Sequence, residues 1–208
     1  MKNKLAMFDM DGTLYDTIDS NYYSYKTAVE REGLSLDRDF FINECYGHNY
    51  KVFVPMIAAQ HIAGQKNKPA DSETVKDEVE QLVDEAMLER IHQYKKDLYT
   101  SYLDKIRVNE HLFNIIELIK GEYNIALVTT ASKKNVYEIL DHFGHAELFD
   151  YVFTQEDVKE QKPDPKCYLL AMEHFGCDKS DSIIFEDSPV GLQAAHRSGA
   201  RIFKVEKF

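Results

Sequence analysis

The architecture of the chain is indicated by one stretch, Leu5-Ala6-Met7-Phe8-Asp9-Met10-Asp11-Gly12-Thr13-Leu14, in which a short apolar run ends in two acidic residues and a glycine. Such a run predicts a buried β-strand. Side chains alternate between the faces of a strand, so Asp9 and Asp11 are expected to point the same way while the strand lasts. Two carboxylates so placed repel each other unless a cation, a shared proton or a raised pKa relieves them. The stretch therefore predicts either a metal-assisted carboxylate site or a strand that exits into a polar turn around Gly12.

The hexapeptide Asp9-Met10-Asp11-Gly12-Thr13-Leu14 resembles the first motif of the haloacid dehalogenase superfamily of phosphatases and phosphomutases. The resemblance implies that Asp9 is a nucleophile that attacks phosphorus and becomes an aspartyl-phosphate. It further implies that Asp11 acts first as a general acid and then as a general base. The remaining parts of such a site have to come from the rest of the chain.

The composition is that of an ordinary globular protein with an excess of negative charge. The 208 residues suffice for one sizeable core and a smaller second lobe. A formal net charge of -11 argues against nucleic-acid partners, because phosphate backbones are bound by basic surfaces. A small anionic substrate remains compatible, since a bound cation, one lysine and helix N-termini reverse the field locally. No apolar run approaches the length of a membrane span, so no membrane partner is expected.

The cysteines indicate a reducing environment. They are odd in number and have no C-x-x-C spacing; they are Cys45, Cys167 and Cys177. This pattern favours reduced thiols and a cytoplasmic protein, with no disulfide framework and no metal cluster. The N-terminus also lacks a basic-then-apolar leader, because the first strand begins almost at once. The oligomeric state is left open by the sequence.

Two hydrophobic patterns divide the chain. From Tyr15 to about residue 105, apolar residues recur at helical spacing without a strand signal, with breaks expected near Gly47 and Pro55. After that, strand and helix patterns alternate, which is typical of a parallel sheet. The sequence therefore predicts an α/β fold with a doubly wound, Rossmann-like parallel sheet, interrupted after its first strand by an all-helical cap domain. The expected domains are a core of residues 1–14 and 106–208 and a cap of residues 15–105.

Two groups of polar residues that suit phosphate follow expected strands of the second half. Thr129 and Thr130 end the strand over residues 125–128, where a hydroxyl beside a helix N-terminus can hold a phosphoryl oxygen. Lys162 stands in a loop that two prolines stiffen, and a lysine near Asp9 would balance the charge of a transferring phosphoryl group. Taken alone, the threonines are also compatible with an ordinary strand end, and the lysine with a solvated surface.

A second acidic pair suits a metal ion. Glu186 and Asp187 end the strand over residues 182–185, which repeats the arrangement of Asp9 and Asp11. Oxygen ligands from two neighbouring strand ends can hold Mg²⁺ and leave room for water and substrate. An acidic helix cap is the alternative explanation of Asp187.

Together these residues resemble the four motifs of the superfamily, in the same order and at the same strand positions. The resemblance implies catalysis by Asp9 and Asp11, and phosphate binding by Thr129, Thr130 and Lys162. It also implies Mg²⁺ as cofactor, with the ligands Asp9, Asp11 through its backbone carbonyl, Asp187 and Glu186.

The helical insert resembles the cap of the subgroup that contains phosphoglycolate phosphatase and β-phosphoglucomutase. The resemblance implies a Mg²⁺-dependent phosphatase that hydrolyses a small phosphorylated metabolite under a closing lid. A sugar phosphomutase is the alternative, against which Asn21 stands about where those enzymes carry a histidine, and no arginine follows Gly47. A non-catalytic binding or regulatory protein is less favoured, because all four motifs are intact. The substrate itself is not determined by the sequence.

Overall fold

The computed structural model describes residues 2–206 and divides into two compact units. The sheet unit consists of residues 1–17 and 107–208, and the helical unit consists of residues 18–106. The expected cap of residues 15–105 corresponds to the helical unit apart from a few residues at its ends. Its role as a cap stays a prediction.

The sheet unit is built on five parallel strands. They are β1 (Lys4–Phe8), β4 (Tyr123–Val128), β5 (Tyr151–Phe153), β6 (Ser182–Glu186) and β7 (Arg201–Lys204). Their order in the sheet is β5-β4-β1-β6-β7, so β1 is central and Met7 pairs with Ala126 on one side and Ile184 on the other. The chain fills the sheet on one side of β1 and then on the other, which confirms the predicted doubly wound fold.

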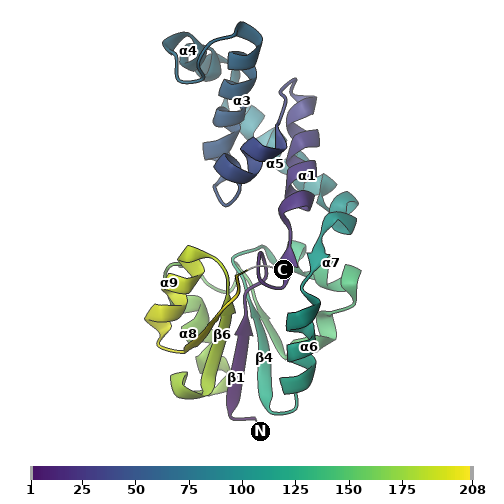
Figure 1. The fold of residues 1–208 in the computed structure, drawn as a ribbon, viewed down its shortest axis with the longest axis vertical. Coiled ribbons are helices and arrows are strands. Elements are labelled where there is room, and N and C mark those ends of the chain that lie inside the picture. Colours follow the sequence, from purple (N-terminus) through teal and green to yellow (C-terminus); the bar gives the residue numbers. More distant parts are fainter. Residues whose placement is uncertain (1, 207–208) are drawn as a thin grey trace. The chain divides into compact units, whose positions relative to one another are not determined.

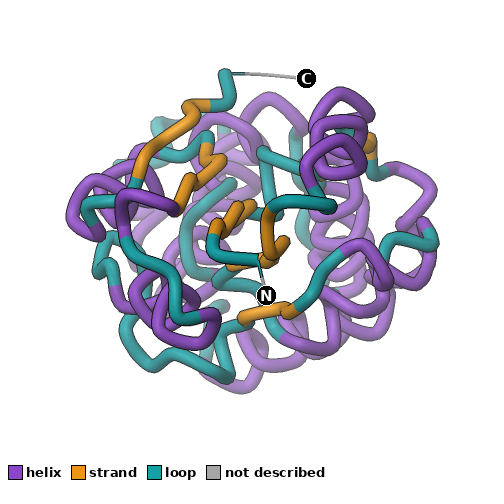
Figure 2. Tube along the Cα trace, turned by 90° about the horizontal axis from the view of Figure 1, so that it is seen from below, coloured by secondary structure: helices purple, strands orange, loops and turns teal. Residues whose placement is uncertain are grey.

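Helices cover both faces of this sheet. They are α6 (Glu110–Ile119), α7 (Lys133–Phe143), α8 (Lys166–Phe175) and α9 (Pro189–Ser198), with short turns η3 (Ala146–Leu148) and η4 (Lys179–Asp181) between them. Figure 1 shows α8 and α9 on one side of the strands and α6 on the other, and Figure 2 distinguishes strands from helices by colour. Leu5 and Met7 of β1 pack with Ala171 of α8 and Ala194 of α9 in one buried cluster. Burial on both faces explains why β1 reads as a continuous apolar run.

A two-stranded ribbon corrects the expectation that a helix begins at Tyr15. The strands β2 (Tyr15–Asp16) and β3 (Arg107–Val108) pair antiparallel, and the guanidinium of Arg107 binds the Asp16 carboxylate. Two residues are too few to show an alternating pattern, which is why no strand was predicted here. The fully buried ring of Tyr15 packs against Phe113, so this segment belongs to the sheet unit.

The helical unit has its own core. Its elements are α1 (Ile18–Arg31), α2 (Arg38–Phe40), η1 (Phe41–Cys45), α3 (Tyr50–Lys66), α4 (Glu73–Leu82), α5 (Glu85–Tyr99) and η2 (Thr100–Lys105). The predicted interruption at Gly47 lies between η1 and α3, but the one at Pro55 is wrong, because α3 continues through it. Phe53, Val54 and Ile57 are all buried around this proline, and their packing offsets the hydrogen bond that it lacks.

Two further observations concern the described residues as a whole. None of their helices combines the length and the apolar character that crossing a membrane requires. The three cysteines are buried free thiols.

Replacing Asn109 is expected to destabilise the sheet unit by about 1–3 kcal/mol, because this buried side chain satisfies two backbone groups. Its amide donates to the carbonyl of Thr13 at 3.1 Å, and its oxygen accepts from the first turn of α6 at Leu112. Denaturant unfolding of Asn109→Ala measures the loss. Asn114→Ala, an exposed position on the same helix, is the matched control. Equal stability of the two variants would contradict the role of Asn109.

Candidate active site

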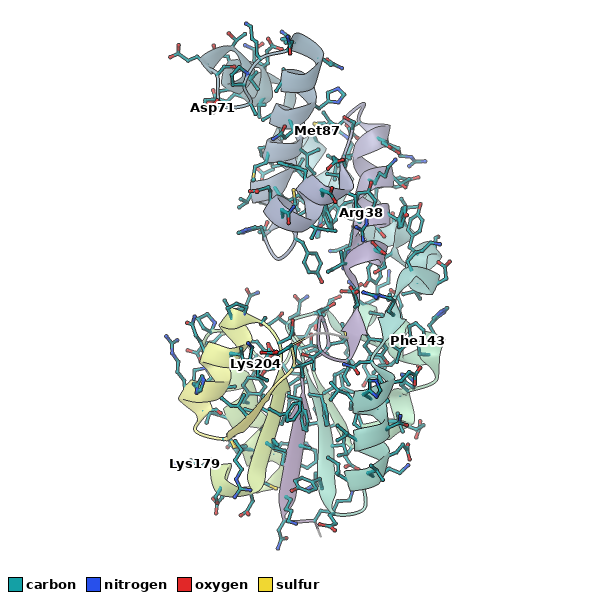
Figure 3. All side chains as sticks on the ribbon, viewed as in Figure 1. Arg38, Asp71, Met87, Phe143, Lys179 and Lys204 are labelled. Carbon is teal, nitrogen blue, oxygen red and sulfur yellow. The ribbon has the colours of Figure 1, made fainter. Side chains whose placement is uncertain are left out.

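The predicted site residues lie at the edge of the sheet where the parallel strands end. β1 ends at Phe8, β4 at Val128 and β6 at Glu186. In Figure 3, the labelled Lys204 at the end of β7 marks this edge, and Lys179, which precedes β6, lies toward the opposite one. Doubly wound sheets bind their ligands beyond the carboxyl ends of the strands.

Asp9 and Lys162 form a buried ion pair. The backbone amide of Asp9 donates to the carbonyl of Phe185 at 3.0 Å, which fixes the residue just beyond β1. The Nζ atom of Lys162 donates to Asp9 Oδ1 at 2.6 Å, and both side chains are almost inaccessible. Burial is the largest single effect and lowers the pKa of Lys162, but the charge of Asp9, the nearby Tyr168 and Glu186 and the hydrogen bond to Asp9 together raise it more, so its pKa lies well above the ordinary value. Lys162 is therefore a permanent cation at the carboxylate that we expect to be the nucleophile.

A tight turn after β1 brings Asp187 against the first motif. Gly12 has a φ of +84°, and a Cβ atom there would lie 2.2 Å from Asp187 Oδ2, so only glycine fits. The hydroxyl of the fully buried Thr13 donates to Asp187 Oδ1 at 2.9 Å. Burial, and then the charge of Asp9, raise the pKa of Asp187, while the bond from Thr13 opposes the rise. The turn thus holds the carboxylate of Asp187, which follows β6, against the residues that follow β1.

Glu186 is enclosed completely. Its Oε1 atom accepts from the hydroxyl of Ser188 at 2.7 Å, and a Cβ atom on Gly191 of α9 would lie only 1.6 Å from that oxygen. Its Oε2 atom lies 3.6 Å from Lys162 Nζ and has no hydrogen-bond partner among residues 2–206. Burial, and then the charge of Asp9, raise the pKa of Glu186 to about 8. Because the Oε2 atom of Glu186 has no hydrogen-bond partner among residues 2–206, it is free to bind a cation or a proton.

The three carboxylates Asp9, Glu186 and Asp187 fit a divalent cation. Each offers an oxygen, and the three oxygens lie within 4.8 Å of one another. Carboxylate oxygens are the donors that Mg²⁺ prefers, and an incomplete set of protein ligands suits its habit of keeping waters. The pKa values of Glu186 and Asp187 are raised first by burial and then by the charge of Asp9, and a cation would favour the ionised form of both carboxyl groups. The remaining predicted ligand is the backbone carbonyl of Asp11, which is not one of these side-chain atoms and stays a prediction.

The carboxyl group of Asp11 is held by Thr17, which directly follows β2. The hydroxyl of Thr17 donates to Asp11 Oδ1 at 2.5 Å, and Thr17 is fully buried. The backbone amide of Gly12 donates to the carbonyl of Tyr15, which closes the turn between them. The carboxyl group of Asp11 is thus held by Thr17 and is not one of the three grouped carboxylates, which suits a separate role in proton transfer.

The two predicted threonines lie in one small pocket with Lys162. Thr129 is buried, and its hydroxyl oxygen accepts from the backbone amide of Ala131 at 3.0 Å. Thr130 is exposed and lines the same pocket as Thr129 and Lys162. Ser132 caps α7, as the sequence suggested, by accepting from the amide of Asn135. The structure therefore brings both threonines to the lysine, and phosphate binding by them stays a prediction.

Four residues that contact the carboxylates of the site were not predicted from the sequence to have a role there. Thr13 lies inside the first motif, and Ser188 was recognised only as a helix cap. Thr17 and Gly191 act through contacts that no local pattern signals. Of these contacts, the one between Thr13 and Asp187 joins segments far apart in the chain, whereas the other three residues lie within six positions of the carboxylates that they contact.

The chain is similar to known proteins over nearly its whole length. The family model described as haloacid dehalogenase-like hydrolase matches residues 6–205. A curated relative from Thermotoga maritima, named phosphorylated carbohydrates phosphatase, is 27% identical over 202 residues, which are 96% of this chain and 84% of the relative.

Solved structures share the fold. A crystal structure from Haemophilus somnus, described as a predicted phosphoglycolate phosphatase, has a TM-score of 0.79 at 21% identity and covers 100% of this chain and 87% of its own. A β-phosphoglucomutase from Clostridium difficile has a TM-score of 0.65 at 21% identity, covering 100% of this chain and 86% of its own. At these identities the likeness concerns the fold alone. The match of the family model over nearly the whole chain confirms the predicted relationship, and the chain belongs to the haloacid dehalogenase-like hydrolase family.

Proposed function

We propose that this protein is a Mg²⁺-dependent phosphatase that hydrolyses a small phosphorylated metabolite through an aspartyl-phosphate on Asp9. The observation that carries the proposal is the buried pair of Asp9 and Lys162 beside the group of three carboxylates. The names of relatives support the substrate class, since the Thermotoga maritima relative is named as a phosphatase of phosphorylated carbohydrates. A cytoplasmic location is part of the proposal, on the pattern of the cysteines.

The proposed reaction has two steps on the residues of this site. In the first, a carboxylate oxygen of Asp9 attacks phosphorus, the bond to the leaving oxygen breaks, and Asp11 gives that oxygen its proton. In the second, Asp11 takes a proton from water, whose oxygen attacks the phosphorus and releases inorganic phosphate and the Asp9 carboxylate. Lys162 and Thr129, with Thr130 beside it, hold the phosphoryl oxygens, and Lys162 balances their charge in both steps.

The metal would be held by Asp9, Asp187 and Glu186, with the backbone carbonyl of Asp11 as a further predicted ligand. When bound, Mg²⁺ supplies positive charge that balances the phosphoryl oxygens and the crowded carboxylates. Thr13 keeps the Asp187 carboxylate oriented toward this group, and Ser188 does the same for Glu186.

Phosphate release from a panel of phosphorylated metabolites and one aryl phosphate, with and without Mg²⁺, tests the function. We expect turnover that requires the metal and is lost in Asp9→Asn. The ranking of sugar phosphates, phosphoglycolate and nucleotides then identifies the substrate class. Conversion of a sugar phosphate to its isomer without phosphate release would indicate a mutase instead. A folded protein that binds Mg²⁺ and turns over none of these compounds would contradict catalysis.

Mg²⁺ is expected to raise the thermal stability of the protein. Binding to the folded state at about 100 times the dissociation constant adds about 2.7 kcal/mol to the free energy of unfolding. Differential scanning fluorimetry at increasing Mg²⁺ measures the rise in Tm. Asp187→Asn should abolish most of the rise, whereas Asp181→Asn, at an exposed position of η4, should leave it unchanged. The same rise in both variants would place the metal elsewhere.

A further inference from the structure

Tyr168 is a buried residue of the sheet unit that the proposed mechanism does not use. It lies in the first turn of α8, and its side chain is fully inaccessible. Its ring belongs to the buried cluster that contains Leu5, Met7 and Val128. A phenylalanine would fill the same apolar space, so packing alone does not account for the hydroxyl group.

The hydroxyl group of Tyr168 is buried without a hydrogen-bond partner among residues 2–206. Burying a hydroxyl without a partner is unfavourable, and such groups are rare in native proteins. The Oε2 atom of Glu186 is in the same condition. Lys162 is the neighbour that both groups share.

Contacts around the Lys162 ammonium connect these groups. Its Nζ atom lies 5.1 Å from the centre of the Tyr168 ring, 3.6 Å from Glu186 Oε2 and 2.6 Å from Asp9 Oδ1. An ammonium has three N–H groups, and the contact with the carbonyl of Val128, at 3.5 Å, is long for a hydrogen bond. Burial raises the pKa of Tyr168 well above its ordinary value and the charge of Lys162 opposes the rise, as expected for a hydroxyl near the ammonium.

We propose that Tyr168 is a positioning residue that holds the Lys162 ammonium against Asp9. The ring attracts the cation at 5.1 Å, and a small shift of the side chains from the described positions lets the hydroxyl oxygen accept from the ammonium and donate its proton to Glu186 Oε2. The inference rests on the proposed phosphatase function, because a fixed ammonium matters for neutralising a transferring phosphoryl group. Tyr168 acts through Lys162 and has no contact with substrate in this proposal.

The first test is the kinetics of Tyr168→Phe with an aryl phosphate at saturating Mg²⁺. Loss of one hydroxyl keeps the ring in place, so we expect kcat to fall about 10-fold with KM nearly unchanged. The matched control is Tyr151→Phe, since Tyr151 of β5 is 38% exposed and packs on His174 away from the residues assigned to the site. This control is expected to retain the kcat of the wild type.

A double-mutant cycle separates positioning from general structural support. If Tyr168 acts through Lys162, then Tyr168→Phe should cause no further loss of kcat in a Lys162→Met background. A residue that only supports the fold would cause the same fold loss in both backgrounds. Retention of kcat within about two-fold in the single variant, or an equal loss in both backgrounds, overturns the proposal.

Thermal unfolding keeps the inference testable if the wild type releases no phosphate, an outcome that would contradict the proposed function by itself. An unused buried hydroxyl destabilises the protein, so its removal should raise the Tm. A hydroxyl bonded to Lys162 and Glu186 contributes to stability, so Tyr168→Phe should melt at or below the wild-type temperature. A higher Tm for Tyr168→Phe would overturn the positioning role independently of activity.

Discussion

Asp9→Asn is expected to lower kcat for phosphate release by about 10⁴-fold or more, because it removes the proposed nucleophile. Asparagine has nearly the same shape, but its amide is a poor nucleophile and cannot form the phosphoryl intermediate. The change also leaves the buried ammonium of Lys162 without its partner at 2.6 Å. Phosphate release under saturating substrate and Mg²⁺ measures the effect.

Two comparisons make this result interpretable. Asp181→Asn makes the same chemical change at an exposed position and should retain full activity. Far-ultraviolet circular dichroism and the Tm show whether Asp9→Asn is folded. Activity of folded Asp9→Asn within about ten-fold of the wild type would exclude Asp9 as the nucleophile, since a lost nucleophile costs far more.

Gly191→Ala is expected to lower both stability and activity, because the added methyl group has no space. Its Cβ atom would lie 1.6 Å from Glu186 Oε1, and the hydroxyl of Ser188 donates to that same oxygen at 2.7 Å. Overpacking of this kind costs about 1–3 kcal/mol. The carboxylate must also move relative to Asp9 and Lys162, and a displacement of about 1 Å at a reacting site lowers the rate by about 10²-fold.

The matched control is Gly64→Ala in α3, where an added Cβ atom meets nothing within 4 Å. Here alanine should stabilise the protein by about 0.4–1 kcal/mol, because it restricts the unfolded chain and favours the helix. Denaturant unfolding and phosphate release are measured for both variants. Wild-type activity and stability in Gly191→Ala would show that Glu186 moves freely and is not part of a fixed site.

The sheet was predictable because its signals are local. An apolar run that stops at Asp9 predicts a buried strand and also its end, and capping residues such as Ser132 and Ser188 mark where helices begin. The alternation of these elements then determines a parallel sheet with its site at one edge. The ribbon of β2 and β3 was missed because two residues carry no periodicity. Pro55 misled because the gain from tertiary packing exceeded its local preference.

The site was predictable only in part, because the motifs indicate its charged residues but not the residues that hold them in place. Motif order indicated Asp9 and Lys162 as partners, although they are separated by most of the chain. Nothing local indicates that Thr17 binds Asp11 or that Gly191 makes room for Glu186. These residues are within six positions of each other, but their contacts depend on the turn after β1 and on where α9 begins after β6, which no short pattern specifies.

The ribbon of β2 and β3 has a consequence for how this chain can diversify. It pairs Asp16 with Arg107, so the ribbon holds together the two ends of the segment between them. The entropic cost of closing such a segment into a loop grows only slowly with its length. Insertions, deletions or replacement of the whole segment between these positions should therefore leave the order of the strands in the sheet unchanged. The intervening segment can therefore change in sequence and length while Asp9 and Asp187 keep their places at the end of the sheet.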